Sequence, residues 1–232
     1  MSLSLLHVRK MTGVVILLLL LVMSHQIDAM SLKYRPARTT DLPGIAKLLC
    51  VTFEEIPEWN VVKMKMSEDG YKKQLDYRMQ RLVKRGAKHA LIVVVPDNGN
   101  DVAGFMELGT MPSAIPVKSE WNGVETESRP EMPYLANVAV GTNYRRQKIG
   151  SKLVKLAMKI SEKWCEPDDT DPALYLAVDV DNDAAVNMYD KLDFDRIIDE
   201  TEKSDAPYKD KEGNVRRKPR LYFRKLLDSS AN

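Results

Sequence analysis

The sequence predicts a mixed α/β domain with a central sheet of about seven strands flanked by about four helices. Three observations predict this class. Short runs rich in Val, Leu and Tyr recur along the chain at lengths typical of strands. Stretches with apolar residues three and four positions apart, typical of amphipathic helices, stand between them. Apolar residues make up 44% of the 232 residues and charged residues 29%, as in ordinary folded proteins.

The segment 1–29 precedes the domain, which we expect to span residues 30–232. Arg9 and Lys10 come before the uncharged, apolar run 11–24, the layout of a signal peptide. The run is shorter than the roughly 20 residues that span a bilayer, which favours a cleaved signal over a retained anchor.

Three interpretations of this segment stay open, and they differ in localisation. A signal cleaved after Ala29 predicts the secretory pathway, and a retained anchor predicts membrane contact through residues 11–24. Translation could instead begin at Met30, directly before the first strand, which predicts the cytoplasm. A plastid is a further alternative.

Residues 32–53 predict a strand followed by a helix. The run 32–37 is short and extended, and Thr40 and Asp41 then supply side chains suited to an N-cap. The following apolar residues fall on one helical face; they are Leu42, Ile45, Leu48, Leu49 and Phe53. A second helix is predicted from about Ser67 to Arg85, with Gly86 as its stop.

Residues 89–95 and 102–108 predict an antiparallel pair of strands. Both runs are apolar and they flank Asn98 and Gly99, the strongest short hairpin signal in a sequence. The polar, Pro-containing stretch from Gly109 to Pro133 lacks any period and predicts a long surface loop. A further apolar strand is predicted at 134–140.

The C-terminal part predicts two helices and three strands. A long amphipathic helix starts at Ile149 and ends near Pro167; its apolar positions are Leu153, Ala157, Ile160 and Trp164. Strands follow at 173–180, 194–199 and 220–227, with a helix from about Asn182 to Leu192 and a charged loop from Lys203 to Pro219.

Charge and cysteine content argue against several classes of function. The net charge is only +2, so the bulk basic character of a nucleic-acid binder is absent, and no nucleic-acid partner is predicted. The basic residues that lead into the last strand are more typical of a solvated face; they are Arg216, Arg217, Lys218 and Arg220. Cys50 and Cys165 lack neighbours at metal-ligand spacing, so no metal is predicted, while a disulfide between them stays open.

The segment 134–159 places a turn rich in hydrogen-bond donors between a strand and a helix. Backbone N–H groups at a helix N-terminus suit a pyrophosphate, and Arg145 and Arg146 stand beside them. Gly150 permits close approach of the ligand. A solvated basic turn is the alternative on charge alone.

This segment resembles the acetyl-CoA loop of the GNAT acetyltransferase superfamily, whose pattern Arg/Gln-x-x-Gly-x-Gly/Ala follows a strand ending in VAV. Here the pattern runs from Arg145 to Gly150, and Lys148 replaces the first glycine. A second block, LYLAVDVDNDAAVNMYDKLDF, is similar to the strand, the Asn-x-x-Ala-x-x-x-Tyr helix and the closing Leu-x-Phe of the same family. Its matching positions are Asn182, Ala185, Tyr189 and Phe194. The two motifs in this order are more specific than either alone, and the resemblance extends loosely from Tyr34 to Leu226.

The resemblance implies a GNAT fold, in which the fourth and fifth strands splay apart in a V and admit acetyl-CoA as co-substrate. Those strands are 134–140 and 173–180 here. The implied cofactor-binding residues are Val138, Ala139, Val140, Arg145, Arg146, Gln147, Lys148, Ile149, Gly150, Ser151 and Asn182.

The implied reaction is direct attack of a primary amine on the thioester in a ternary complex. By analogy with the family, the hydroxyl of Tyr189 protonates the departing CoA thiolate. Glu107 is the first candidate for the base that accepts the proton of the amine, with Asp179 and Asp181 as alternatives. Tyr189 could instead be a core tyrosine, and each carboxylate could be a solvated or capping group.

A peptide or protein amine is the expected acceptor, either an N-terminal α-amine or a lysine side chain. The loops 54–60 and 203–219 combine acidic residues with Trp59 and Tyr208, and loops choose the acceptor in such folds. The motifs look most like those of protein N-terminal and plastid-type lysine acetyltransferases. Alternatives are a small-molecule amine such as a polyamine, and an acyl-CoA-binding module without catalytic activity.

Overall fold

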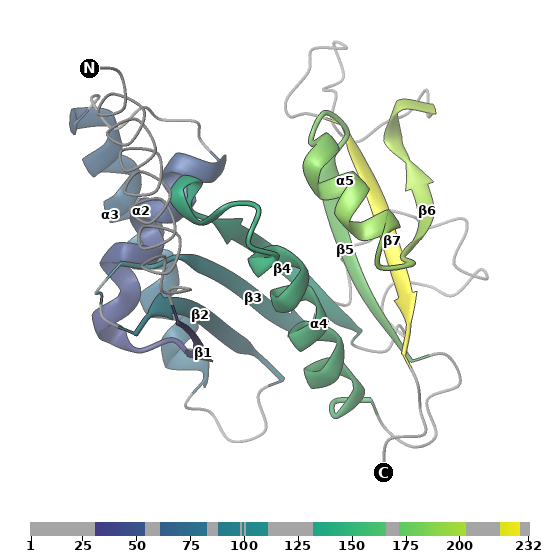
Figure 1. Ribbon diagram of the computed structural model, residues 1–232, viewed down its shortest axis with the longest axis horizontal. Coiled ribbons are helices and arrows are strands. Elements are labelled where there is room, and N and C mark those ends of the chain that lie inside the picture. Colours follow the sequence, from purple (N-terminus) through teal and green to yellow (C-terminus); the bar gives the residue numbers. More distant parts are fainter. Residues whose placement is uncertain are drawn as a thin grey trace, which may run out of the picture.

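A mixed seven-stranded sheet with order β1-β2-β3-β4-β5-β7-β6 forms the centre of the molecule (Figure 1). The computed structural model describes residues 31–53, 61–82, 88–97, 99, 101–110, 132–165, 172–202 and 219–227. Along the chain its main elements are β1 (Leu32–Pro36), α2 (Leu42–Phe53), α3 (Val61–Leu82), β2 (Ala90–Pro96), β3 (Gly104–Thr110), β4 (Pro133–Val140), α4 (Ile149–Glu162), β5 (Ala173–Asp179), α5 (Asp183–Asp190), β6 (Asp195–Asp199) and β7 (Arg220–Leu226). Within these residues, seven strands and four α-helices in this order confirm the predicted fold class.

The ends of several elements differ from the sequence-based predictions. Helix α3 begins at Val61 instead of Ser67, because residues 61–66 contain no Gly or Pro and continue as helix. The antiparallel pairing of β2 with β3 is confirmed, with Val94 opposite Gly104. Gly86, Asn98 and most of the predicted loops at 54–60, 109–133 and 203–219 lie outside the described residues.

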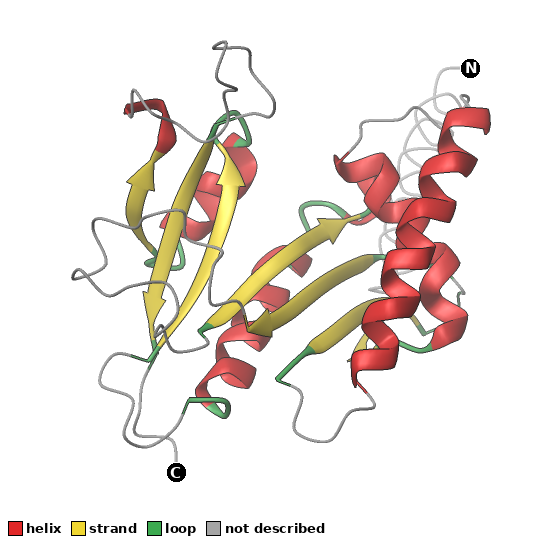
Figure 2. Cartoon of the chain, turned by 180° about the vertical axis from the view of Figure 1, so that it is seen from behind, coloured by secondary structure: helices red, strands yellow, loops and turns green. Residues whose placement is uncertain are grey.

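Helices cover both faces of the sheet (Figure 2). On one face, α2 and α3 pack through Ile45, Leu49 and Leu75 onto Val93 and Phe105. On the opposite face, α4 and α5 share a second core with the remaining sheet residues, in which Leu153, Val186 and Phe223 are buried. Strand β2 is apolar on both faces because each face is covered by helices.

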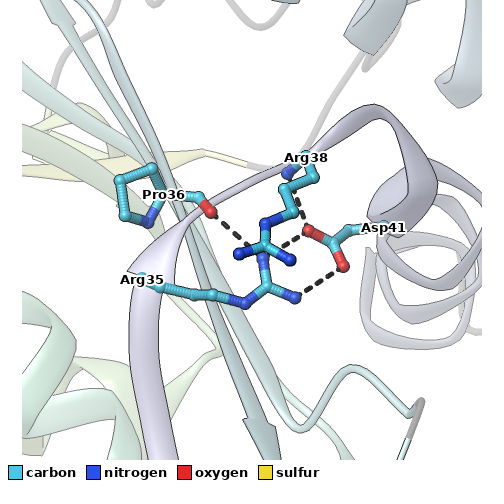
Figure 3. A network of polar contacts seen from close by, with 4 residues as sticks. All are labelled: Arg35, Pro36, Arg38 and Asp41. Carbon is cyan, nitrogen blue, oxygen red and sulfur yellow. Dashed lines mark hydrogen bonds and ion pairs between the residues drawn. The ribbon is translucent and has the colours of Figure 1, made fainter.

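The turn from β1 into α2 is fixed by a compact polar network (Figure 3). Arg35 donates to both oxygens of Asp41, at 2.7 and 2.9 Å. The same carboxylate accepts from the backbone N–H of Arg38 at 2.7 Å. The predicted capping by Asp41 is therefore corrected: the residue ends a short 3-10 helix (Thr39–Asp41) and reaches back to Arg38 instead of acting as the N-cap of α2.

The parallel pair β4 and β5 is joined only at its beginning. Tyr134 pairs with Tyr175 and Leu135 with Leu176, and the described strands have no further register between them. Figure 1 shows the two strands diverging toward their C-terminal ends. This is the predicted V-shaped splay.

No helix within the described residues is long and apolar enough to span a bilayer. The apolar run 11–24 and the predicted cleavage after Ala29 lie outside those residues. Cys50 and Cys165 do not form the disulfide that the sequence had left open.

Candidate active site

The loop between β4 and α4 lies at the open end of the splay. A short 3-10 helix (Thr142–Tyr144) leads from β4 into residues 145–148, which are all exposed. The buried side chain of Ile149 anchors the start of α4 over β3, where a Cβ on Gly104 would come within 3.0 Å of Ile149 Cγ2. The packing of Ile149 therefore holds the C-terminal end of the loop in place.

Gly150 lies between β4 and α5. A Cβ at this position would come within 3.1 Å of Met188 Sδ on α5 and 3.8 Å of Val140 Cγ2 on β4. The first turn of α4 thus bridges the two sides of the splay, which explains why a residue without a side chain stands here.

Free backbone donors gather in this turn. The first hydrogen bond of α4 runs from the N–H of Lys152 to the carbonyl of Lys148 at 3.0 Å. The N–H groups of Ile149, Gly150 and Ser151 precede that bond, so they are available to an anion at the positive end of the helix. Arg145 and Arg146 add exposed positive charge beside them.

Two residues of the loop adopt the left-handed conformation that glycine prefers. Arg146 has φ of 65° and Lys148, which precedes the first helical residue, has φ of 61°. The positive φ explains why the family pattern has a glycine at position 148. Lys148 adopts the same left-handed conformation at a cost of about 1 kcal/mol. The departure from the pattern therefore leaves the turn in place.

The predicted cofactor-binding residues fall into two groups. Val138, Ala139 and Val140 lie on β4, and the residues from Arg145 to Ser151 form the loop and first turn described above. Asn182 stands apart as the N-cap of α5, where its Oδ1 accepts from the N–H of Ala185 at 3.2 Å. This cap is the role that the structure gives Asn182, and contact with a cofactor stays a prediction.

Tyr189 is buried on α5, at 5% exposure. Its ring packs against Phe194 and Phe223, with centroids 5.6 Å away in each case. Burial, and secondarily the nearby Tyr134 on β4, raise the pKa of the phenol well above its ordinary value. The hydroxyl therefore stays protonated at neutral pH, the form that a proton donor requires.

Glu107 lies on β3, on the face covered by α2 and α3, and only 8% of it is exposed. Its Oε1 lies 3.0 Å from His89 Nε2. Its Oε2 accepts from Arg78 of α3 and, at 2.7 Å, from Asn137 Nδ2 of β4. Burial raises the pKa of Glu107, but the hydrogen bond from His89, the charge of Arg78 and the bond from Asn137 outweigh it and lower the pKa.

Strand β4 contains a bulge at the residue that contacts Glu107. The register moves from Phe105 opposite Ala139 to Glu107 opposite Ala136, so Asn137 and Val138 together face a single residue of β3. Asn137 has φ of 52°. Bulges bend a strand and interrupt its ladder, and this one begins two residues after Leu135, the last described residue of β4 that pairs with β5.

Arg78, His89 and Asn137 are site residues that were not predicted from the sequence. An Asn inside an otherwise apolar strand was the available signal for the bulge, because Asn is depleted in strands and tolerates the left-handed region. No local pattern marks Arg78 or His89.

Of the alternative bases, Asp179 accepts from Arg220 Nε at 3.2 Å, and Asp181 is exposed in the turn before α5. No three His, Cys, Asp or Glu side chains converge on a metal-sized site among the described residues.

Residues 53–194, more than half of the chain, match the sequence model of the acetyltransferase (GNAT) family. No curated protein matches the sequence at a significant level.

Solved structures match the fold over most of the chain. NAA60 of Arabidopsis thaliana, in complex with acetyl-CoA, is 16% identical with a TM-score of 0.56, and the match covers 85% of this chain and 99% of that one. The ribosomal-protein-S18-alanine N-acetyltransferase of Escherichia coli is 17% identical with a TM-score of 0.53, over 87% and 97% of the two chains. A chain of the NatC complex bound to Gag peptide and CoA is 18% identical with a TM-score of 0.53, over 86% and 100%.

Proposed function

Because the chain belongs to the acetyltransferase (GNAT) family, we propose that it transfers the acetyl group of acetyl-CoA to a primary amine. The observation that carries the proposal is the first turn of α4, which presents free N–H groups and bridges β4 and α5 through Gly150. The pyrophosphate of acetyl-CoA would bind there, beside Arg145 and Arg146. The pantetheine arm would then enter the splay along Val138, Ala139 and Val140.

The proposed reaction needs one proton donor and one proton acceptor. The amine nitrogen attacks the carbonyl carbon of the thioester, and the bond from carbon to sulfur breaks. Tyr189 gives its proton to the departing thiolate, which leaves as the thiol. Tyr189 then regains a proton from water. The proton lost by the amine passes to a carboxylate or to water, with Glu107, Asp179 and Asp181 as the candidates from sequence.

A protein N-terminal α-amine or a lysine side chain is the proposed acceptor. Two of the structural relatives are a ribosomal-protein alanine N-acetyltransferase and a NatC complex bound to a peptide, which supports a peptide amine. The face of the sheet opposite α4 is the proposed side of entry, because the pyrophosphate loop occupies the α4 side. A small-molecule amine and an acyl-CoA-binding module without turnover are the competing assignments.

Peptide acetylation detected by mass spectrometry tests the proposal. The full chain, and a second version starting at Met30, are incubated with acetyl-CoA and a mixed peptide library, and α-amine and lysine products are scored separately. We expect acetylated peptides from at least one version. Gly150→Glu is the control, because a side chain and a negative charge in the first turn of α4 should abolish both CoA binding and acetylation.

The two alternatives give different results. Binding of CoA with acetylation of polyamines but of no peptide would assign a small-molecule acceptor. Binding without acetylation of any amine would contradict catalytic activity and favour the binding module.

For localisation, we propose delivery to the secretory pathway or membrane anchoring through residues 11–24. The apolar run and the preceding basic residues support this proposal. Sequencing the N-terminus of the protein purified from its own cells distinguishes retention of residue 1 from a chain that begins at residue 30. Met30→Leu then separates the other two interpretations, because cleavage after Ala29 still yields a chain that begins at residue 30, whereas a translation start at Met30 is lost.

A further inference from the structure

We propose that Arg78, His89 and Glu107 are positioning residues that hold the bulge of β4 in place through Asn137, and that acetyl transfer depends on this support. We call these four residues the bulge brace. The inference rests on the proposed function and deepens it, because it assigns Glu107 a role other than that of the base.

The bulge is the part of β4 that most needs support. Asn137 occupies the left-handed region, which costs a residue with a side chain about 1 kcal/mol. In the described part of the sheet, β4 has no pairing with β5 beyond Leu135, so on that side no ladder fixes the bulge. The bond from Asn137 Nδ2 to Glu107 Oε2, at 2.7 Å, supplies the missing attachment from the β3 side.

Glu107 is suited to this task because it is buried and stays ionised. Its lowered pKa keeps it a carboxylate at neutral pH, so both oxygens accept. His89 therefore donates from Nε2 to Oε1, and its Nδ1 is buried without a partner among the described residues. Arg78 balances the negative charge. Hydrogen bonds to an ionised group in such surroundings are among the strongest in proteins.

The neighbouring elements make room for the brace. A Cβ on Gly109 of β3 would come within 3.2 Å of His89 Cδ2, so this glycine lets the ring lie against the strand. Arg78 belongs to α3, so the brace joins this helix to β3 and β4. The position of the bulge is thereby tied to the helical layer on the proposed acceptor side.

The arrangement favours positioning over proton transfer for Glu107. A base must take up a proton from the amine, whereas the donors Arg78, His89 and Asn137 contact both oxygens of Glu107 and lower its pKa, which weakens it as a proton acceptor. The bulge carries Val138, whose backbone is proposed to hold the pantetheine arm. A displacement of about 1 Å at such a place can lower a rate on the order of a hundredfold.

Asn137→Gly removes the side-chain hydrogen bond to Glu107 but permits the same left-handed backbone conformation. Glycine adopts the left-handed region without cost, so the bulge can persist, but the bond to Glu107 is lost. We expect kcat for peptide acetylation to fall at least about tenfold. The Kd for CoA should change by a smaller factor than kcat, because the residues from Arg145 to Ser151 are untouched and only the contact of Val138 with the pantetheine arm is displaced.

Asp193→Gly is the matched control. Asp193 is also left-handed, with φ of 56°, but it lies in the exposed turn after α5 and away from Glu107. We expect wild-type kcat from this variant. Wild-type kcat and KM in Asn137→Gly would overturn the proposal.

A double-mutant cycle with Glu107→Gln tests whether the two residues act through one bond. If they do, Asn137→Gly in the Glu107→Gln background causes a much smaller loss of kcat than in the wild type. A base loses activity when it is protonated, so kcat falls at acid pH, and this fall should be the same in Glu107→Gln as in the wild type if Glu107 is not the base. Additive losses in the cycle, or disappearance of this fall in Glu107→Gln, would contradict the brace and return Glu107 to the role of base.

Amide hydrogen exchange measures how firmly the bulge is held and does not require turnover. Peptides covering residues 133–144 should exchange faster in Asn137→Gly than in the wild type or in Asp193→Gly, without any substrate present. If the wild type acetylates no amine, the proposed function fails while this measurement still decides the brace. Unchanged exchange in an active enzyme would contradict the brace and leave the proposed function standing.

Discussion

Gly104 of β3 lies directly against Ile149, the first residue of α4, and a Cβ on the glycine would come within 3.0 Å of Ile149 Cγ2. The same Cβ would lie 3.3 Å from Val94 Cγ2 and 3.4 Å from the carbonyl oxygen of Ala139. The end of the proposed pyrophosphate loop is thus packed on the sheet through a close contact, in which a methyl group would press against three neighbouring atoms.

Gly104→Ala should therefore lower both stability and cofactor affinity. Overpacking of this kind costs about 1–3 kcal/mol in the free energy of unfolding, and movement of Ile149 would shift the N–H groups of the turn. Chemical denaturation and calorimetric titration with CoA measure the two effects. Gly70→Ala is the control: nothing lies within 4 Å of its Cβ, so this helix position should gain about 0.5–1 kcal/mol. Unchanged CoA affinity in a destabilised Gly104→Ala would show that this packing does not position the loop.

Replacements of Lys148 should reveal the cost of its left-handed conformation. We expect Lys148→Gly to be more stable than Lys148→Ala by about 1 kcal/mol, because both variants lack the charge and only alanine is strained at φ of 61°. The same two replacements at Lys152, inside α4, should give the opposite order by about 1 kcal/mol. Thermal and chemical unfolding of the four variants check this comparison, and equal stability of the two Lys148 variants would contradict it.

Tyr189→Phe should lower kcat at least about tenfold and leave the Kd for CoA nearly unchanged, as expected for loss of a general acid. Because the pKa of the phenol is raised, its proton is retained throughout the neutral range, and Tyr189 should contribute no limb to the pH profile below pH 9, roughly one unit under its ordinary pKa. Tyr77→Phe, at a tyrosine that is 65% exposed on α3, is the control and should behave as the wild type. Wild-type turnover in Tyr189→Phe would remove Tyr189 from the mechanism.

Asp41→Asn should destabilise the protein in a pH-dependent way. The hydrogen bonds from Arg35, opposed by burial and helped by the N–H of Arg38, lower the pKa of Asp41 below its unfolded value. The ionised group therefore stabilises the fold above its unfolded pKa of about 3.9, and this contribution is lost as the pH falls through the lower folded pKa. At pH 7 we expect a loss of about 1–2 kcal/mol in the free energy of unfolding.

Denaturation at several pH values tests this dependence. The difference between the wild type and Asp41→Asn should shrink as the pH falls below about 4. Asp97→Asn is the comparison variant, since the partner Lys33 is 67% exposed and screened by water, and its effect should be smaller. A difference for Asp41 that does not vary with pH would contradict the electrostatic explanation.

The sequence by itself determined the order of strands and helices, because apolar periodicity is a local property of the chain. The steps of four, four, three and four residues from Ile149 to Trp164 predict α4, and the donor-rich turn before it marks the proposed pyrophosphate loop. Periodicity did not locate the ends of every element: α3 begins at Val61, because residues 61–66 contain neither Gly nor Pro.

The tertiary structure decided what Glu107 contacts. Its partners Arg78, His89 and Asn137 come from three other segments of the chain, and no periodic pattern relates them to Glu107. Their convergence follows from the pairing of β3 with β2 and β4 and from the packing of α3 on that face. The left-handed conformations of Asn137 and Lys148 were likewise hidden, because neither residue requires that region and only the bulge and the helix start impose it. Local patterning therefore fixes which elements form, whereas the surroundings of each side chain depend on contacts between residues that are distant in sequence.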